Sequence, residues 1–317
     1  MAGKLDLDLD LDLDLDLGSR AAPGSGSGPR FNTDDFPRLI PAPFPPTLPV
    51  PTKDYSLDGW DPELRAWAYV EEFIDSYAAN GTTAVAVIRD AIKAQTVFPV
   101  PDRNHTLPGI AKPLMPADMQ QQVLGVLDAS IDRADRSLEI LDQASGQGAL
   151  RYWTGMLRTD PSKDRNTFLL MLVARKIGEY VAMGLKQYFQ MRRPAQVYPL
   201  IMPLIDGPDT PSFPSSHSLQ AHLITGVLKL ALTPAVQPVW PPTAPPPPPC
   251  ANTAQALDVL ADRIAYNREV AGVHYRMDSL AGIFAAAQCI NQLYGLPATS
   301  LFKTLVVAAN TELSDMH

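Results

Sequence analysis

Two of the five histidines in this sequence stand among residues that suit the binding of an anion. The chain reads PSFPSSHS over residues 211–218, which contain His217, and NREVAGVHYRMD over residues 267–278, which contain His274. A histidine can act as a nucleophile, a general acid or a general base near neutral pH. The two segments therefore indicate chemistry in which one imidazole attacks and the other moves a proton.

Basic side chains accompany both histidines. Six residues separate Lys186 from Arg193, and Arg268 lies six positions before His274. We expect Lys186 near the C-terminal end of a helix that Pro194 ends, and the seven-residue spacing would place Lys186 and Arg193 on one face while the chain remains helical. Three cations close to a pair of histidines would hold a tetrahedral oxyanion.

Two serines and one aspartate complete the set. Ser215 and Ser216 stand where a proline-rich loop becomes a helix, and free backbone N–H groups at a helix start favour an anion. Asp278 follows His274 by four residues, so its carboxylate can fix the tautomer of the imidazole and raise its basicity. Asp278 is alternatively an N-cap of the last predicted helix, and the two roles are compatible.

These segments resemble the three signature motifs of the superfamily of type 2 phosphatidic acid phosphatases and vanadium haloperoxidases. The family patterns are Lys-x6-Arg-Pro, Pro-Ser-Gly-His and Ser-Arg-x5-His-x3-Asp, and all three occur here in order between Lys186 and Asp278. Two positions depart from the family: Ser216 replaces a glycine, and Asn267 replaces a serine. A serine at position 216 would be strained if that position required a positive φ.

The resemblance implies a role for each matched residue. His274 would attack phosphorus and form a phosphohistidine, His217 would protonate the leaving oxygen and then activate water, and Asp278 would orient His274. The phosphate oxygens would be held by the remaining matched residues: Lys186, Arg193, Ser215, Ser216 and Arg268. Such a phosphatase of phosphate monoesters requires no metal or other cofactor.

The same family pocket also supports a second reaction. In a vanadium haloperoxidase, vanadate is the cofactor, His274 would be its ligand, and hydrogen peroxide would oxidise a halide. Met183 and Thr210 stand where aromatic or histidine side chains often flank the haloperoxidase pocket, which favours the phosphatase. A third hypothesis is a non-catalytic scaffold that assembles through the low-complexity segments and has no use for His217 and His274.

Apolar residues recur at intervals of three and four, and few segments favour strands, so the predicted fold class is all-α, a helical bundle of the phosphatase/haloperoxidase type. Gly81 would stop the first helix. The predicted helices are Pro62 to Tyr77, Thr83 to Ala94, Ala117 to Ala144, Ala149 to Leu157, Asn166 to Tyr188, His217 to Leu232, Thr253 to Ala271 and Met277 to Tyr294.

The N-terminal region has a different composition from the rest. Residues 1–30 contain alternating Leu and Asp and a Gly/Ser-rich linker, which we interpret as a disordered tail. Residues 31–317 would form a single helical domain, in which residues 31–60 are a proline-rich arm. Prolines number 32 in the chain, and a second proline-rich run covers residues 234–249.

Charge and hydropathy limit the partners. The first 17 residues carry six aspartates and one lysine, so they hold −5 of the net charge of −8 and leave −3 for the other 300. A nearly neutral body argues against nucleic acid. Neither a secretory signal nor a run of about 18 apolar residues is evident, so we expect a soluble, cytoplasmic protein without a membrane span. The expected partners are a small phosphate ester, or vanadate, peroxide and halide, and the family resemblance suggests a homo-oligomer.

Overall fold

The computed structural model describes residues 59–94, 97–99, 106–108, 116–144, 149–233 and 252–314. The predictions for the Leu-Asp tail, the linker, most of the proline-rich arm and the run at 234–249 lie outside these residues. From Asp61 onward the described chain is one compact unit. The all-α prediction is confirmed, and the described part contains in addition one antiparallel pair of three-residue strands, β1 (Val97–Pro99) and β2 (Thr106–Pro108).

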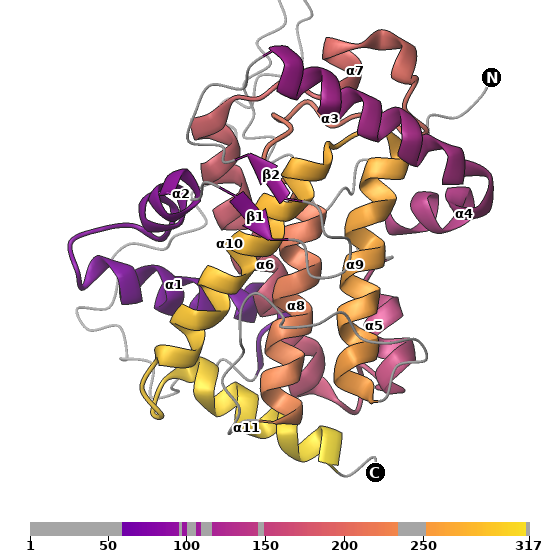
Figure 1. Cartoon of the computed structure of the whole chain (residues 1–317). Coiled ribbons are helices and arrows are strands. Elements are labelled where there is room, and N and C mark those ends of the chain that lie inside the picture. Colours follow the sequence, from indigo (N-terminus) through magenta and orange to yellow (C-terminus); the bar gives the residue numbers. More distant parts are fainter. Residues whose placement is uncertain are drawn as a thin grey trace, which may run out of the picture. The chain divides into compact units, whose positions relative to one another are not determined.

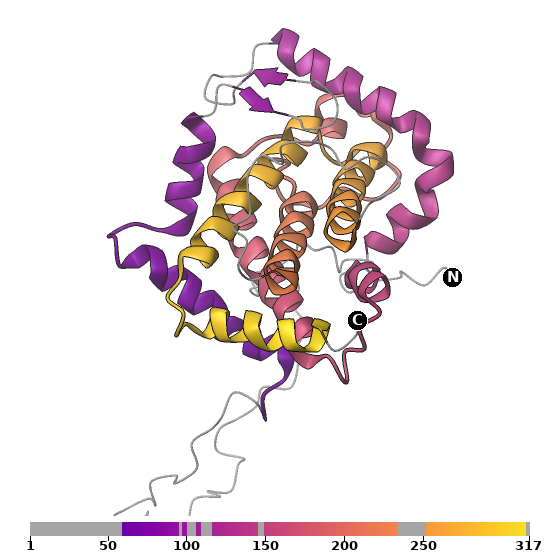
Figure 2. The same ribbon diagram turned by 60° about the horizontal axis from the view of Figure 1, so that its bottom comes forward.

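Helix α8 (Ser216–Leu232) lies at the centre of the unit and packs against three long helices (Figures 1 and 2). These helices are α6 (Arg165–Phe189), α9 (Thr253–Ala271) and α10 (Arg276–Gly295). Nearly every side chain of α8 is buried, which explains why its sequence is apolar on all sides rather than on one face. The N-terminal end of this central helix is therefore held rigidly, and the predicted site lies there.

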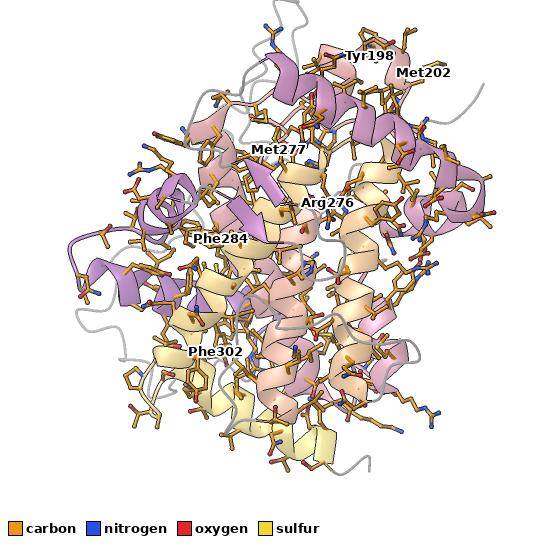
Figure 3. The ribbon with its side chains drawn as sticks, in the orientation of Figure 1. Tyr198, Met202, Arg276, Met277, Phe284 and Phe302 are labelled. Carbon is orange, nitrogen blue, oxygen red and sulfur yellow. The ribbon has the colours of Figure 1, made fainter. Side chains whose placement is uncertain are left out.

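The remaining helices surround this centre. Helix α11 (Leu301–Ser314) packs across α6 and α8 at the end of the bundle far from the N-terminus of α8, with Phe302 buried, whereas Tyr198 and Met202 at the other end are exposed (Figure 3). The other elements are α1 (Pro62–Ala78), α2 (Ala84–Ala94), α3 (Pro116–Ala129), η3 (Ser130–Asp132), α4 (Arg133–Gln143), α5 (Leu150–Leu157), α7 (Pro194–Val197) and η4 (Pro199–Ile201).

The prediction of one continuous helix over residues 117–144 is wrong in one respect, because the 3₁₀ turn η3 divides this segment into α3 and α4. A 3₁₀ turn has three residues per turn instead of 3.6, so it rotates the faces on either side of it. Two apolar residues of this segment, which a single amphipathic helix would have placed on its buried face, are exposed, Ile131 at 76% and Leu138 at 83%. The guanidinium of Arg133 donates to the carbonyls of Ile201, Met202 and Val270, and this anchor holds the start of α4.

Charged residues interrupt the apolar sequence of α6, and the structure pairs them with α1. Arg175 Nη2 lies 2.5 Å from Glu63 Oε1, and Lys176 Nζ lies 3.4 Å from Glu63 Oε2. Glu63 is in the first turn of α1, where a carboxylate is also stabilised by the helix dipole. The described part of the chain contains no helix that is long and apolar enough to cross a membrane.

Candidate active site

His274 and Asp278 lie together at the start of α10. His274 Nδ1 is 3.1 Å from Asp278 Oδ2, and the same oxygen accepts hydrogen bonds from Ser212 Oγ at 2.6 Å and from the Tyr275 backbone N–H at 3.0 Å. Because Tyr275 is the N-cap of α10 and Asp278 its third residue, the carboxylate also stabilises the helix start. The expectation that Asp278 is the N-cap is therefore wrong, because Tyr275 holds that position, but Asp278 stabilises the helix start from the third position while it also contacts His274.

The hydrogen-bond partners of His274 define its tautomer. Arg193 Nη1 lies 3.2 Å from His274 Nε2, and a guanidinium can only donate. Nε2 must then be the acceptor, and the ring proton is on Nδ1, where it points to the carboxylate of Asp278. Burial, and secondarily the positive charges of Arg193 and Lys186, hold the pKa of His274 well below its usual value. The imidazole is thus neutral, with its lone pair on Nε2.

The pKa of Asp278 shifts in the opposite direction. Burial raises it to about 6, although the hydrogen bonds from Ser212 and from the Tyr275 backbone, and the positive charges of Lys186 and Arg193, act to lower it. The carboxylate is fully buried, so desolvation of its charged form is the larger effect. Above pH 6 the group is ionised and can accept the Nδ1 proton of His274.

Two of the three predicted cations lie against the loop that leads into α8. Lys186 Nζ donates to the Pro211 carbonyl at 2.6 Å, while Arg193 Nε and Nη2 donate to the carbonyl and hydroxyl of Thr210 at 2.9 and 3.0 Å. Both cations are buried. Loop residues 210–212 therefore hold both cations in place, and Arg193 in addition contacts the imidazole of His274.

The expectation that Lys186 and Arg193 share a helix face is wrong. Helix α6 ends at Phe189, because Gln190 adopts the left-handed conformation with φ 51°. Arg193 is instead the N-cap of α7, with Pro194 as the first helical residue, where proline is favoured. The two side chains meet because the chain turns between them.

The start of α8 matches its prediction. Ser215 is the N-cap, its Oγ accepts from the Ser218 N–H at 3.3 Å, and its own N–H donates to the Asp278 carbonyl at 3.1 Å. Ser216 is the first helical residue and is not among the non-glycine residues with positive φ in the described chain, so the serine is not strained. The Ser216 hydroxyl is buried and has no hydrogen-bond partner among the described residues.

His217 and Arg268 lie on the other side of the site, against the C-terminal end of α4. His217 Nε2 is 3.3 Å from the Gln143 carbonyl, and Arg268 Nη2 donates to the Ile140 carbonyl at 3.0 Å. The Gln143 side-chain oxygen is 3.4 Å from Arg268 Nη2 and accepts from Asn267 Nδ2 at 2.9 Å. Asn267, the second departure from the family pattern, therefore supports this side of the site.

Sequence reasoning missed Ser212 and Gln143 as site residues. Ser212 lies within the segment 211–218, where its polar side chain between prolines was an available signal. Gln143 gives no signal in the sequence, because it belongs to a helix far from the motifs and reaches the site only through packing. Of the two residues expected beside the pocket, Thr210 contacts Arg193, and Met183 is half-buried one turn before Lys186.

A comparison with models of protein families finds a match in this part of the chain. The model of the PAP2 superfamily matches residues 167–300, which run from the start of α6 to the residue before α11. The match includes both histidines, Asp278, the three cations and both serines. No curated protein matches the chain.

Proposed function

We propose, from the match of residues 167–300 to the PAP2 superfamily, that the protein hydrolyses phosphate monoesters through a phosphohistidine intermediate. The observation that carries the proposal is the position of His274 between Asp278 and Arg193. Its Nδ1 proton is directed to a carboxylate and its Nε2 lone pair to a cationic cluster. A neutral imidazole with a fixed tautomer is a competent nucleophile.

Binding of the phosphoryl group depends on the surrounding positive charge. Lys186, Arg193 and Arg268 are all buried, so their charges are weakly screened by solvent. The first backbone N–H groups of α8, at Ser216 and His217, add partial positive charge at the same place. Negative charge that develops on the phosphoryl oxygens in the transition state would be stabilised by these groups without reorganisation.

The reaction then proceeds in two balanced steps. In the first, His274 Nε2 forms a bond to phosphorus, the bond from phosphorus to the ester oxygen breaks, and protonated His217 gives its proton to that oxygen to release the alcohol. In the second, His217 takes a proton from water, the water oxygen attacks phosphorus, and the phosphorus–nitrogen bond breaks to release inorganic phosphate. Asp278 stabilises the positive charge of the His274 ring between the two steps.

The residues present also fit vanadate, the cofactor of the haloperoxidase branch. The three cations would hold its oxygens, and His274 Nε2 is a neutral donor with its second nitrogen bound to Asp278, which is the usual arrangement of a metal-ligating histidine. Vanadate would supply the activation of peroxide for halide oxidation. We favour the hydrolase, because every matched residue has a place in the two steps and no further reactant is required.

The test compares both activities in purified protein. We expect hydrolysis of p-nitrophenyl phosphate that persists in a metal chelator. We also expect a labelled phosphoenzyme, trapped by quenching in an alkaline denaturant because phosphohistidine is labile in acid, that is absent in His274→Ala. The matched control is His222→Ala, because His222 is on α8 but bonds to Ser218 O and Asp262 and not to the site. Bromide oxidation that requires vanadate and peroxide, without hydrolysis, would identify the protein as a haloperoxidase. Neither activity, together with no binding of vanadate, would favour the scaffold.

A further inference from the structure

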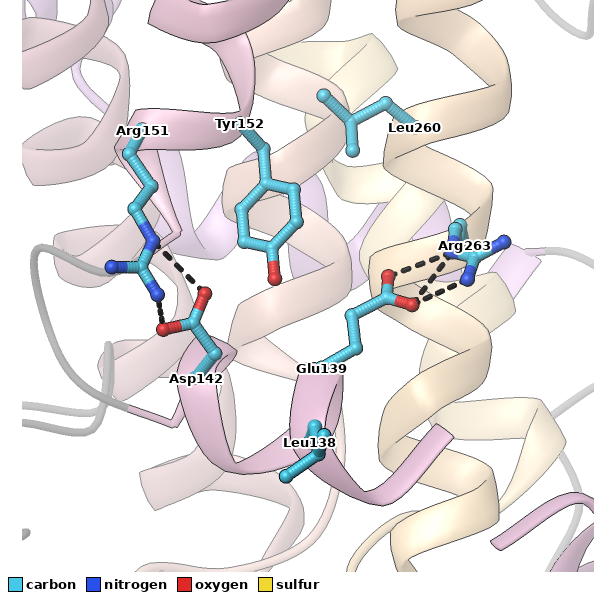
Figure 4. A pocket seen from close by; sticks show the side chains of 7 residues that line it. All are labelled: Leu138, Glu139, Asp142, Arg151, Tyr152, Leu260 and Arg263. Carbon is cyan, nitrogen blue, oxygen red and sulfur yellow. Dashed lines mark hydrogen bonds and ion pairs between the residues drawn. The ribbon is translucent and has the colours of Figure 1, made fainter. Parts of the chain in front are cut away.

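A cavity of about 560 Å³ opens between α4, α5 and α9, outside the set of residues described so far. Figure 4 shows the side chains that line it, with the hydroxyl end of Tyr152 directed between Asp142 and Glu139. Its volume lies within the range of sites that bind small organic molecules. The lining residues are Leu138, Glu139, Asp142, Arg151, Tyr152, Leu260 and Arg263.

The charges in this cavity balance. Arg151 Nε donates to Asp142 Oδ2 at 2.9 Å, and Arg263 makes two hydrogen bonds to Glu139 Oε2, from Nε at 2.8 Å and from Nη2 at 2.5 Å. Two cations and two anions leave no net charge, so a charged ligand gains nothing from the cavity. Burial raises the pKa of Tyr152, which keeps this side chain a neutral phenol.

One buried side chain, that of Gln143, contacts both a residue that lines the cavity and a residue of the candidate active site. Gln143 Nε2 donates to Glu139 Oε1 at 2.9 Å on the cavity side, and Gln143 Oε1 is 3.4 Å from Arg268 Nη2 on the other side. The backbone carbonyl of the same residue faces His217. The cavity therefore lies on the side of the site where His217 would protonate the leaving oxygen.

We propose that this cavity binds the leaving group of the substrate and that this group is a neutral aromatic alcohol. The inference rests on the proposed function, since it assigns the organic part of the ester whose phosphoryl group His274 attacks. An ester that spans both places would replace the hydrogen bond between Gln143 and Arg268 with one from Arg268 to a phosphoryl oxygen.

The lining favours a planar group over a lipid chain or a sugar. The phenol of Tyr152 and the guanidinium planes of Arg151 and Arg263 offer surfaces on which an aromatic ring can stack. Of the seven lining residues only Leu138 and Leu260 are aliphatic, and Leu138 is largely exposed, which is too little aliphatic surface for an acyl chain. The carboxylates that would accept hydrogen bonds from sugar hydroxyls are already engaged by arginines.

The test uses binding of two non-hydrolysable anions, phenylphosphonate and methylphosphonate, measured by titration calorimetry. Wild-type protein should bind the phenyl compound about tenfold more tightly. Tyr152→Leu should reduce this ratio about threefold to fivefold. Arg151→Ala should reduce it about twofold, and because the Arg151 side chain is 62% exposed, this variant preserves the core. Tyr294→Leu is the matched control. This half-buried tyrosine of α10 packs near Lys303 of α11, and its replacement should leave the ratio unchanged.

The outcomes separate this inference from the proposed function. Three results would overturn the assignment of the cavity. The ratio of the two phosphonate affinities could be near one in wild-type protein, it could be unchanged in both variants, or neither phosphonate could bind. Hydrolysis of phenyl phosphate and methyl phosphate is measured in parallel. Hydrolysis of both esters at similar efficiency would retain the phosphatase and reject the cavity, whereas a ratio that depends on Tyr152 without hydrolysis would retain the cavity and reject the phosphatase.

Discussion

Ser212 Oγ lies 2.6 Å from Asp278 Oδ2, so a loop residue before α8 shares one carboxylate oxygen with His274. In the described part of the chain Asp278 Oδ1 has no hydrogen-bond partner, and Oδ2 receives all three donors. This asymmetry fixes the plane of the carboxylate. The Ser212 contact also links the loop before the second motif to the third motif through side chains, in addition to the backbone bond from Ser215 to Asp278.

The side chains of Asp278 and Ser212 should differ in their importance for the reaction. Asp278→Asn removes the charge that stabilises the His274 ring, and kcat should fall about 10²-fold to 10⁴-fold. Ser212→Ala removes one donor and keeps the charge, so the loss should be about tenfold. Steady-state kinetics with circular dichroism of both variants measures the difference. Equal losses would mean that Asp278 acts through the fold of α10 and not through its charge.

Activity should decline on acidification because Asp278 gains a proton. Its pKa of about 6 is raised by burial, so below pH 6 the neutral carboxyl no longer accepts the Nδ1 proton. The pKa of His274 is well below its usual value, and this ring therefore does not titrate in the same range. The profile of kcat/KM against pH should show an acidic limb near pH 6 that disappears from the residual activity of Asp278→Asn. A limb that persists in this variant would belong to another group.

The geometry of Arg193 should matter beyond its charge. Arg193→Lys keeps a cation but cannot donate to both Thr210 acceptors while it faces His274. We expect kcat/KM to fall about 10²-fold and inhibition by vanadate to weaken by at least tenfold, on the order of one lost charge-assisted contact in each case. Arg192→Lys, at the exposed neighbouring position, is the control and should be unaffected. An active Arg193→Lys would show that charge alone suffices.

Close packing of α8 on α10 requires a glycine. A Cβ at Gly282 would lie 2.7 Å from the Ser215 carbonyl oxygen and 2.9 Å from the Leu219 nitrogen, and these backbone atoms cannot move independently of α8. Gly282→Ala should lower the free energy of unfolding by about 1–3 kcal/mol and reduce activity. Gly125→Ala on α3, where a Cβ meets no atom within 4 Å, should instead stabilise by about 0.5–1 kcal/mol. Urea unfolding of both variants gives the comparison, and a neutral Gly282→Ala would contradict it.

Helices with clear ends were predictable from the sequence, and those with internal breaks were not. Thr253 to Ala271 is α9 to the residue, because Asn252 caps its start and Gly272, with φ 85°, ends it. The turn at Ser130–Asp132 has no glycine or proline to mark it, and tertiary hydrogen bonds of Arg133 hold the chain there. Helix α11 was missed although Phe302, Leu305 and Leu313 already stand at helical spacing.

The candidate site was predictable to the extent that short motifs specify it. His274, Asp278 and Arg193 were identified by type and spacing, and the structure brings them into contact. Motif spacing contains no information on Gln143, whose position beside Arg268 depends on how α4 packs against α9. The prediction that Lys186 and Arg193 share a helix face was wrong because α6 ends at Phe189, before the chain reaches Arg193.

The contact between Ser215 and Asp278 places the N-termini of two helices, α8 and α10, at one point. The partial positive charge of a helix start comes from backbone amides, which do not titrate. In the proposed reaction, attraction of the anion and transport of the proton would thus be carried by separate groups. A descendant of this protein that lost both histidines would still bind anions. The affinity for the anion could therefore change in evolution independently of the rate of the reaction.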